Sequence, residues 1–375
     1  MSKLLININY PLIPFRNLSA LFSMYCILLM PVFSNYVFIG EFSFGDVLFF
    51  LSIPWLVLNF RYNSLNSFQI LLCFCLLFIS LIVFSLEESD NYFGKVLRAA
   101  FYYTSFFIIA GQRKYDYSLF FRHYVLFSLT CSFAIIVQWC LYHILGLSVP
   151  FQLPIAAYEP DTLTQLTHVY RSGGFFKEPS YFAIFVTPII FYFALERRYF
   201  YFVFLCVAGI MSTSTLFLFI ILLSVFFFPR RDSFFIIVTL FLCLFIMLLY
   251  YDGLFDNSIF LVRFISIFTD GGTLNDRFLP VMNLISSSDL FYSKSAVQFI
   301  LTSGFWFSSV GAILAYLGFF CLLFISISFY RFGIFFGCIC FIYMLTTHYL
   351  SSVYSPFVFF SIFSLRLLLR DKKNV

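Results

Sequence analysis

The segment YFYFVFLCVAGIMSTSTLFLFIILLSVFFF, residues 199–228, runs for thirty residues without one Asp, Glu, Lys or Arg. Pairs of arginines flank it at 197–198 and 230–231. A helix needs about 20 apolar residues to cross a hydrocarbon layer about 30 Å thick. The segment is therefore either one long span or two short spans broken at the hydroxyl-rich residues 212–215. This choice decides on which side of the membrane every later loop lies.

Positive charge favours the broken alternative, because Lys and Arg are enriched in cytoplasmic loops. With two spans, 15 of the 22 Lys and Arg residues lie on the inner side and 7 on the outer side. With one span the division becomes 11 against 11. Each arm of the hairpin is then only about 21 Å long, so it is either re-entrant or thins the membrane locally. The hydroxyl groups at the break either line a polar cavity or form a plain turn.

The whole chain is apolar, with 62% hydrophobic and only 10% charged residues, where a soluble domain has roughly 25% charged residues. Backbone groups in lipid must bond within their own segment, which favours helices. We predict one all-α polytopic integral membrane domain, residues 1–375, with about 12 transmembrane helices (11–12) and both termini in the cytoplasm. The predicted spans are residues 18–39, 44–60, 67–86, 96–111, 119–141, 180–195, 199–212, 214–228, 234–251, 305–329, 333–347 and 353–368.

Two predicted outer loops, residues 142–179 and 250–304, are too long to be simple connectors, so function is expected there. The sequence has no Gly-rich nucleotide loop, HExxH or GxSxG motif, and its ten Cys show no zinc-site spacing. No cofactor and no metal are therefore predicted. The excess positive charge lies in the predicted cytoplasmic loops, so it indicates topology and predicts no nucleic-acid partner.

The first loop ends in RSGGFFKEPS, residues 171–180, directly before an apolar run. Its proline suits the first turn of a helix, and a helix N-terminus favours anions. Gly173 and Gly174 allow the backbone to approach a ligand closely, while Arg171 and Lys177 supply hydrogen-bond donors. The segment is therefore predicted to be a phosphate-binding site at the membrane surface.

A structural interpretation of the same residues stays open. Glu178 would then cap the helix, and Arg171 and Lys177 would anchor the chain at the membrane interface. Ligand binding is favoured for the cluster as a whole, because charged residues beside two glycines at a membrane boundary are costly to keep without a partner.

Other candidate residues lie further along the chain or in the same loop. Arg277 is the preferred second anion ligand, since its planar guanidinium can bond two phosphate oxygens and stays charged. Arg263 is either a further ligand or an interfacial anchor. His348, near the outer end of the eleventh predicted span, is either a proton acceptor or an interfacial hydrogen-bonding residue. The same two interpretations apply to His143 and His168 in the first loop.

The segment RSGGFFKEPSYFA, residues 171–183, resembles the R-x-x-G-x-F-x-E-P-x-x-x-A signature of O-antigen polymerases (Wzy) and their O-antigen ligase relatives. The break at 212–215, the outer-loop Arg277 and the segment GAILAYLGFF, residues 311–320, follow the order of that family. The resemblance spans roughly residues 90–365, and residues 171–180 are its specific part.

The resemblance implies a metal-independent glycosyltransferase of the bacterial inner membrane, with its active site on the periplasmic side. Donor and acceptor would be glycans on undecaprenyl pyrophosphate, and the reaction would join oligosaccharide repeat units in lipopolysaccharide O-antigen biosynthesis. Arg171 and Arg277, with Gly173, Gly174 and Lys177, would hold the pyrophosphate. Membrane lipids surround such an enzyme, and the family implies a chain-length regulator as a protein partner.

Catalysis by this family needs little more than charge neutralisation, because pyrophosphate is already a good leaving group. Glu178 or His348 would orient or deprotonate the acceptor hydroxyl. The two residues therefore complete the predicted catalytic set that begins with Arg171 and Arg277.

Three alternatives are weighed against the polymerase. An O-antigen ligase would carry a His-Asn pair near the end of the second loop, and the matching segment TSGFWFSSVGAILAYLG, residues 302–318, has no His. A repeat-unit flippase would need Arg or Lys in the middle of its spans, and this chain has almost none there. A scaffolding membrane protein would leave residues 171–180 as an anchor only.

Overall fold

The computed structural model describes residues 15–40, 42–58, 102, 117–149, 151, 153, 155, 173–176, 178–212, 214, 216, 217, 220, 221, 224 and 353–373. These residues are mostly helical, as the predicted fold class requires. Their elements are α1 (Phe15–Phe33), β1 (Val37–Ile39), β2 (Phe42–Ser43), α2 (Phe44–Leu58), α5 (Tyr117–Leu145), α7 (Pro179–Leu195), α8 (Tyr199–Met211) and α16 (Tyr354–Lys373).

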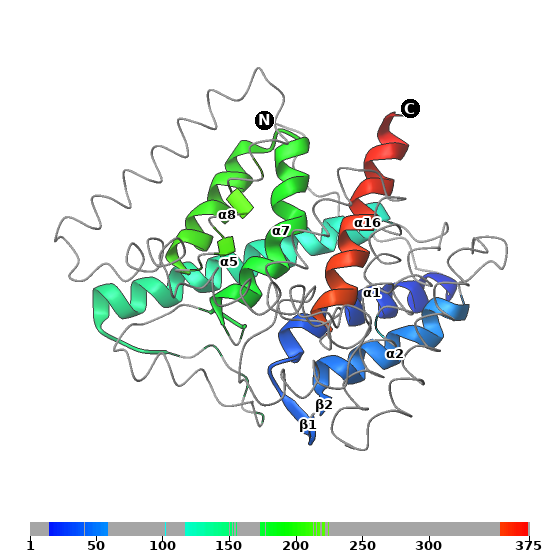
Figure 1. The fold of residues 1–375 in the computed structure, drawn as a ribbon, viewed down its shortest axis with the longest axis horizontal. Coiled ribbons are helices and arrows are strands. Elements are labelled where there is room, and N and C mark those ends of the chain that lie inside the picture. The colour runs from blue at the N-terminus through cyan, green and yellow to red at the C-terminus, as the bar shows by residue number, and fades with distance from the viewer. Residues whose placement is uncertain are drawn as a thin grey trace, which may run out of the picture.

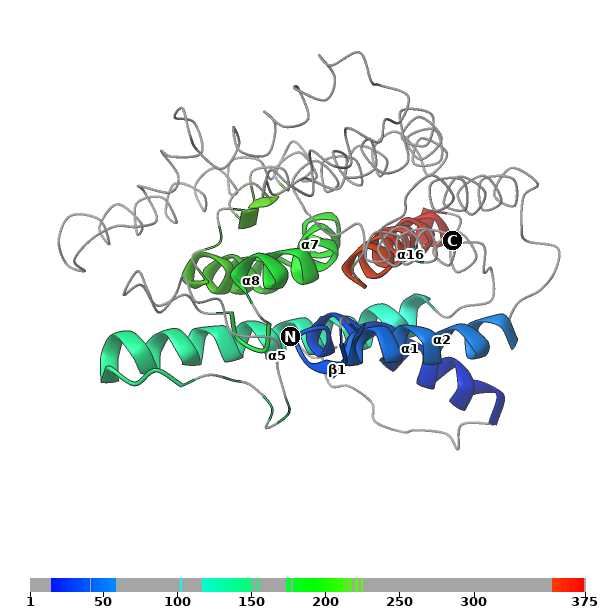
Figure 2. The same ribbon diagram turned by 60° about the horizontal axis from the view of Figure 1, so that its bottom comes forward.

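The labelled helices lie in two layers (Figure 2). Helices α1, α2 and α5 form one layer, and α7, α8 and α16 lie on it. The long helix α5 crosses α7 and α8, while α1 and α2 lie side by side next to α16 (Figure 1). The layers meet at helix α7, which therefore has neighbours on several sides.

Helix α5 is the one helix in the described part of the chain that is long and apolar enough to cross a membrane. Its 29 residues extend about 43 Å at 1.5 Å per residue. Its exposed side carries large apolar residues, with Leu126 and Phe133 62% and 60% exposed, together with Arg122 and Thr130. The buried side follows a three- and four-residue spacing: Tyr117, Phe121, Tyr124, Ser128, Cys131, Ile135 and Gln138.

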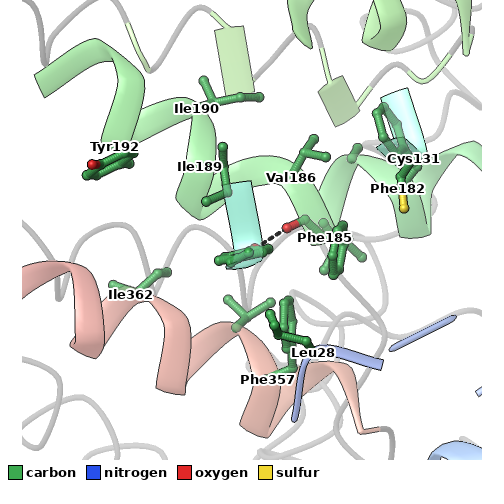
Figure 3. Close-up of a cluster of buried hydrophobic side chains, with 14 of the residues drawn as sticks. Leu28, Cys131, Phe182, Phe185, Val186, Ile189, Ile190, Tyr192, Phe357 and Ile362 are labelled. Carbon is green, nitrogen blue, oxygen red and sulfur yellow. Dashed lines mark hydrogen bonds between the residues drawn. The ribbon is translucent and has the colours of Figure 1, made fainter. Parts of the chain in front are cut away.

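Helix α7 is the centre of the described core (Figure 3). Every residue from Phe182 to Ala194 is buried. The ring of Phe185 contacts the rings of Tyr124 and Phe127 from α5, with centroid distances of 5.3 and 5.7 Å, and stacks on Phe357 of α16 at 5.2 Å. The Tyr124 hydroxyl donates a hydrogen bond to the Phe185 carbonyl. Aromatic rings thus join three helices around one residue.

A three-residue turn joins α7 to α8. The N–H of Arg198 donates to the Phe193 carbonyl (2.9 Å) and the N–H of Arg197 to the Ala194 carbonyl (3.3 Å). These two bonds form a Schellman motif, which needs a residue in the left-handed region. Arg197 occupies that position with φ 56°, although glycine is the usual residue there.

Helix α8 ends at Met211, where the hydroxyl-rich break begins. The Ser212 hydroxyl donates to the Gly209 carbonyl (2.6 Å), so it closes its own helix. The ring of Phe217 lies against Gly209, where any added Cβ would collide with it. Eight residues of continuous helix would separate these positions by about 12 Å. The chain therefore reverses after Met211, so the helix breaks at the predicted place. Whether the hydroxyl groups of residues 212–215 line a polar cavity stays a prediction.

The end of the first predicted span, 18–39, is wrong by six residues. Helix α1 ends at Phe33, and Val37–Ile39 pairs with Phe42–Ser43 in an antiparallel hairpin that turns through Gly40 (φ 57°). A short apolar strand after an apolar helix has no periodicity that separates the two.

The following helix starts where its span is predicted, at residue 44. Ser43 and Asp46 form a reciprocal cap there: the Ser43 N–H donates to the Asp46 carboxylate (2.8 Å), and the Asp46 N–H donates to the Ser43 hydroxyl (3.2 Å).

Six predicted spans overlap described helices: 18–39, 44–60, 119–141, 180–195, 199–212 and 353–368. Except for the first, both ends of each span lie within five residues of the helix ends. The spans 67–86, 96–111, 214–228, 234–251, 305–329 and 333–347 lie wholly or mostly outside the described residues. The outer loops 142–179 and 250–304 also fall largely outside them, although α5 continues four residues into the first loop. The total of about 12 spans stays a prediction.

Candidate functional site

The predicted phosphate-binding segment folds as a tight turn before α7. The N–H of Phe176 donates to the carbonyl of Gly173 (3.0 Å), and Gly174 occupies the first central position with φ 60°. Only glycine adopts that backbone conformation without strain. The sequence after the turn then enters α7 at Pro179, as predicted.

Both glycines are buried, and each is required by a close approach within the protein. A Cβ on Gly173 would lie 2.6 Å from the carbonyl oxygen of Phe176. A Cβ on Gly174 would lie 2.8 Å from a side-chain carbon of Ile135 on α5. The absence of a Cβ thus lets the turn fold on itself and lie directly on α5. Whether these glycines also face a pyrophosphate stays a prediction.

Gln138 of α5 holds the turn by its side-chain amide. Its Oε1 accepts a hydrogen bond from the N–H of Gly174 (2.9 Å), and its Nε2 donates to the carbonyl of Val149 (3.1 Å). Gln138 is 6% exposed, so both halves of its amide are bonded away from solvent. One side chain therefore links the beginning of the first long loop to its end.

Two neighbouring residues after α1 make a second link. The Asn35 side chain donates to the Phe175 carbonyl (3.0 Å), and the Tyr36 hydroxyl accepts from the N–H of Leu153 (2.8 Å). The rings of Phe151 and Phe175 also contact each other, with centroids 5.9 Å apart. Residues 149, 151, 153 and 173–176 therefore meet at one place, which is called the loop neck below.

Glu178 lies at the N-cap position of α7, next to the loop neck. Its backbone is extended (φ −140°, ψ 155°), and its carbonyl accepts from the N–H of Tyr181 (3.1 Å). Its half-buried carboxylate accepts a hydrogen bond from the Ser180 hydroxyl (3.0 Å) instead of bonding the helix backbone. The helix N-terminus favours negative charge at this point. A carboxylate held by one serine has further lone pairs with which to orient a substrate hydroxyl.

Several predicted site residues lie outside the described residues: Arg171, Lys177, Arg263, Arg277, His168 and His348. Gly173, Gly174 and Glu178 are described, and they lie together at the start of α7. His143 packs in the last turn of α5 against the ring of Trp139, with centroids 4.4 Å apart. It is therefore part of an aromatic cluster at the end of that helix.

His123, which the predicted topology assigns to the inner side, forms a hydrogen bond with the Tyr25 hydroxyl at 2.8 Å. Within the described ranges, no group of three or more His, Cys, Asp or Glu lies together in a way that could hold a metal ion.

Sequence reasoning missed the three residues that hold the loop neck, Asn35, Tyr36 and Gln138. Gln138 does carry a signal, because it is a lone amide in an apolar run and shares a helix face with the buried residues of α5. Asn35 and Tyr36 carry none, since the prediction places them inside the first span, 18–39. Their partners are more than 100 residues away in the sequence.

Comparison with family models, with curated proteins and with solved structures returns no match. The signature at residues 171–183 and the geometry of the loop neck are therefore the observations from which a function can be argued.

Proposed function

We propose that this chain is an O-antigen polymerase. It would join oligosaccharide repeat units carried on undecaprenyl pyrophosphate at the periplasmic face of the inner membrane. The single observation that carries the proposal is the segment RSGGFFKEPS, residues 171–180. Its described part is a buried turn that leads directly into the N-terminus of the central helix α7.

In the proposed reaction the bond between the growing glycan and its pyrophosphate breaks, and a bond forms between that glycan and a hydroxyl of the next repeat unit. The leaving group is undecaprenyl pyrophosphate, whose negative charge Arg171 and Arg277 would neutralise. The hydroxyl proton would pass to Glu178 or His348. The extended backbone and the serine bond of Glu178 support its role, because they keep the carboxylate beside the turn and off the helix backbone.

The directions of the helices support the proposed topology. The predicted outer ends of four helices lie together: Gln138 of α5 bonds the turn before α7, and the Tyr354 hydroxyl at the start of α16 donates to the Pro31 carbonyl of α1 (2.7 Å). At the opposite end, Phe121 of α5 contacts the ring of Tyr192, over which the guanidinium of Arg198 lies at 5.8 Å. Consecutive spans that cross the membrane in opposite directions, as predicted, place these helix ends together.

Exposed apolar side chains on α5 support a lipid environment. Large apolar residues turned away from the protein are typical of a membrane span. Leu126 and Phe133 are such residues in the middle of α5, on a side that they share with the exposed Arg122 and Thr130. The proposal of a multi-pass inner-membrane enzyme assumes that the other predicted spans cross the membrane as α5 would.

The proposal is tested in a strain from which the gene for this chain is deleted, with the chain returned on a plasmid. The wild type is expected to restore a ladder of long O-antigen chains on gels of surface polysaccharide. Arg171→Ala is expected to leave lipid A core that carries a single repeat unit, because the departing pyrophosphate is not neutralised. Arg122→Ala, which removes an exposed arginine on the predicted inner side of α5, is the matched control and should keep the ladder.

Other outcomes of the same experiment identify other functions. Bare core with accumulating lipid-linked polymer in the deletion strain would indicate a ligase, and loss of all periplasmic product would indicate a flippase. An unchanged ladder in Arg171→Ala at equal protein abundance would contradict the proposed role of the signature. Labelling of a cysteine introduced beside Arg171 from the cytoplasmic side would contradict the topology.

A further inference from the structure

The first long loop has both of its ends fixed to the same two places, Gln138 of α5 and the segment Asn35–Tyr36 after α1. Val149 and Leu153, shortly after α5, are bonded by Gln138 and Tyr36, and Gly174 and Phe175, shortly before α7, by Gln138 and Asn35. Gln138 of α5 thus contributes one bond to each end of the loop, and the segment Asn35–Tyr36 after α1 contributes one more to each. Arg171 lies two residues before Gly173 of this neck in the sequence.

The side-chain amide of Gln138 is satisfied only when both ends of the loop are bonded to it. It lies on the buried face of an apolar helix, and an amide buried there is costly unless both its donor and its acceptor are bonded. Its acceptor is satisfied by Gly174 and its donor by Val149. Loss of either loop end would leave half of the amide unsatisfied, so the amide favours the arrangement in which both ends are docked.

We propose that Gln138 is a positioning residue for this site. It fixes the Gly173–Phe176 turn on α5, and through the turn it fixes where Glu178 and the N-terminus of α7 lie relative to α5. The role of this position in polymerisation rests on the proposed function. Group transfer depends on the placement of the reacting groups, and a displacement of about 1 Å can cost about 100-fold in rate. A side chain that touches no substrate can therefore control the reaction.

Gln138→Met tests the proposal, because methionine keeps the length of the side chain and removes both hydrogen bonds. Ser132→Ala is the matched control: Ser132 is also buried on α5, but its hydroxyl donates to the Ser128 carbonyl within the helix (2.8 Å). Asn35→Leu removes an independent bond to the same turn from the segment after α1, so it repeats the test if Gln138→Met accumulates poorly. Membrane abundance is measured for all three by immunoblot.

The first measurement does not depend on the reaction. Trypsin cleaves after Arg and Lys. Arg171 and Lys177 lie on either side of residues 173–176 of the neck in the sequence. Cleavage of the purified protein at these two sites is expected to become several-fold faster in Gln138→Met and in Asn35→Leu, and to stay unchanged in Ser132→Ala. An unchanged cleavage rate in both neck variants would overturn the proposal.

The second measurement is polymerisation of lipid-linked repeat units by the purified protein. The kcat of Gln138→Met is expected to fall about tenfold with a smaller change in KM, because the donor still binds while its reacting centre is misplaced. Faster cleavage with unchanged kcat would overturn the link between the neck and the reaction. A wild-type protein that makes no polymer would refute the polymerase, while the trypsin measurement would still decide whether Gln138 holds the loop.

Discussion

The core around α7 and the loop neck are stabilised in different ways. The core contains many interchangeable apolar contacts, with Phe185 alone touching rings from α5, from α16 and from the turn before α7. The neck depends on a few directional bonds and on two glycines that no other residue can replace. The core should therefore tolerate changes of shape that conserve volume, whereas the neck should tolerate almost no change of chemistry.

The largest expected effect comes from opening a cavity in the core. Phe185→Ala should lower the free energy of unfolding by about 3–5 kcal/mol, because several aromatic contacts are lost and the rigid neighbours close the space only partly. Unfolding in detergent can be followed by the reaction of the buried thiols of Cys131 and Cys206 with a coloured reagent.

Leu126→Ala is the control for this truncation, since Leu126 is 62% exposed and should cost less than about 0.5 kcal/mol. Equal effects of the two truncations would mean that α7 is not the packed centre of the protein.

A smaller effect is expected from one methyl group in the neck. Gly174→Ala should cost about 2–4 kcal/mol, since it adds both backbone strain at φ 60° and a collision with Ile135. Gly40→Ala is the matched control, because Gly40 has a similar φ of 57° but open space where the methyl group would lie. Gly40→Ala should cost only about 1 kcal/mol, and both values come from the same thiol-reaction assay.

A second change separates strain from collision at the neck. Adding Ile135→Val to Gly174→Ala removes a methyl group near the collision and should recover part of the loss. If Gly174→Ala costs no more than Gly40→Ala, then the turn does not lie on α5 in solution.

The smallest expected effect is at the C-terminal end of α7, and it is a gain of stability where the earlier changes are losses. Arg197→Gly should raise the free energy of unfolding by about 0.5–1 kcal/mol, because glycine adopts the left-handed conformation of Arg197 without strain. Arg198→Gly should bring no such gain, since the neighbouring residue is not in that conformation and its guanidinium lies over Tyr192. The two variants can be compared by thermal unfolding in detergent, and equal shifts would contradict the Schellman turn.

Much of the described fold could be predicted from the sequence, because its signals are local. Apolar runs, the proline at the start of α7 and the hydroxyl cluster after Met211 each act over a few residues. The helices α5, α7, α8 and α16 therefore start and end within a few residues of their predicted positions. The end of α1 was wrong because the span was continued through Ser34–Tyr36 into the apolar residues Val37–Ile39, and a strand of three residues is too short to show a periodicity of its own.

The candidate site could be predicted only in part. The sequence by itself determined that a glycine pair, a glutamate and a proline lead into an apolar helix, and that a missing Cβ would allow something to approach. Only the tertiary structure decided that Ile135 and the turn's own carbonyl make that approach, and that Gln138, Asn35 and Tyr36 bond the two ends of one loop. The physical reason is range: helix and turn preferences depend on neighbours in sequence, whereas the partners of a buried amide depend on which helix ends meet in space.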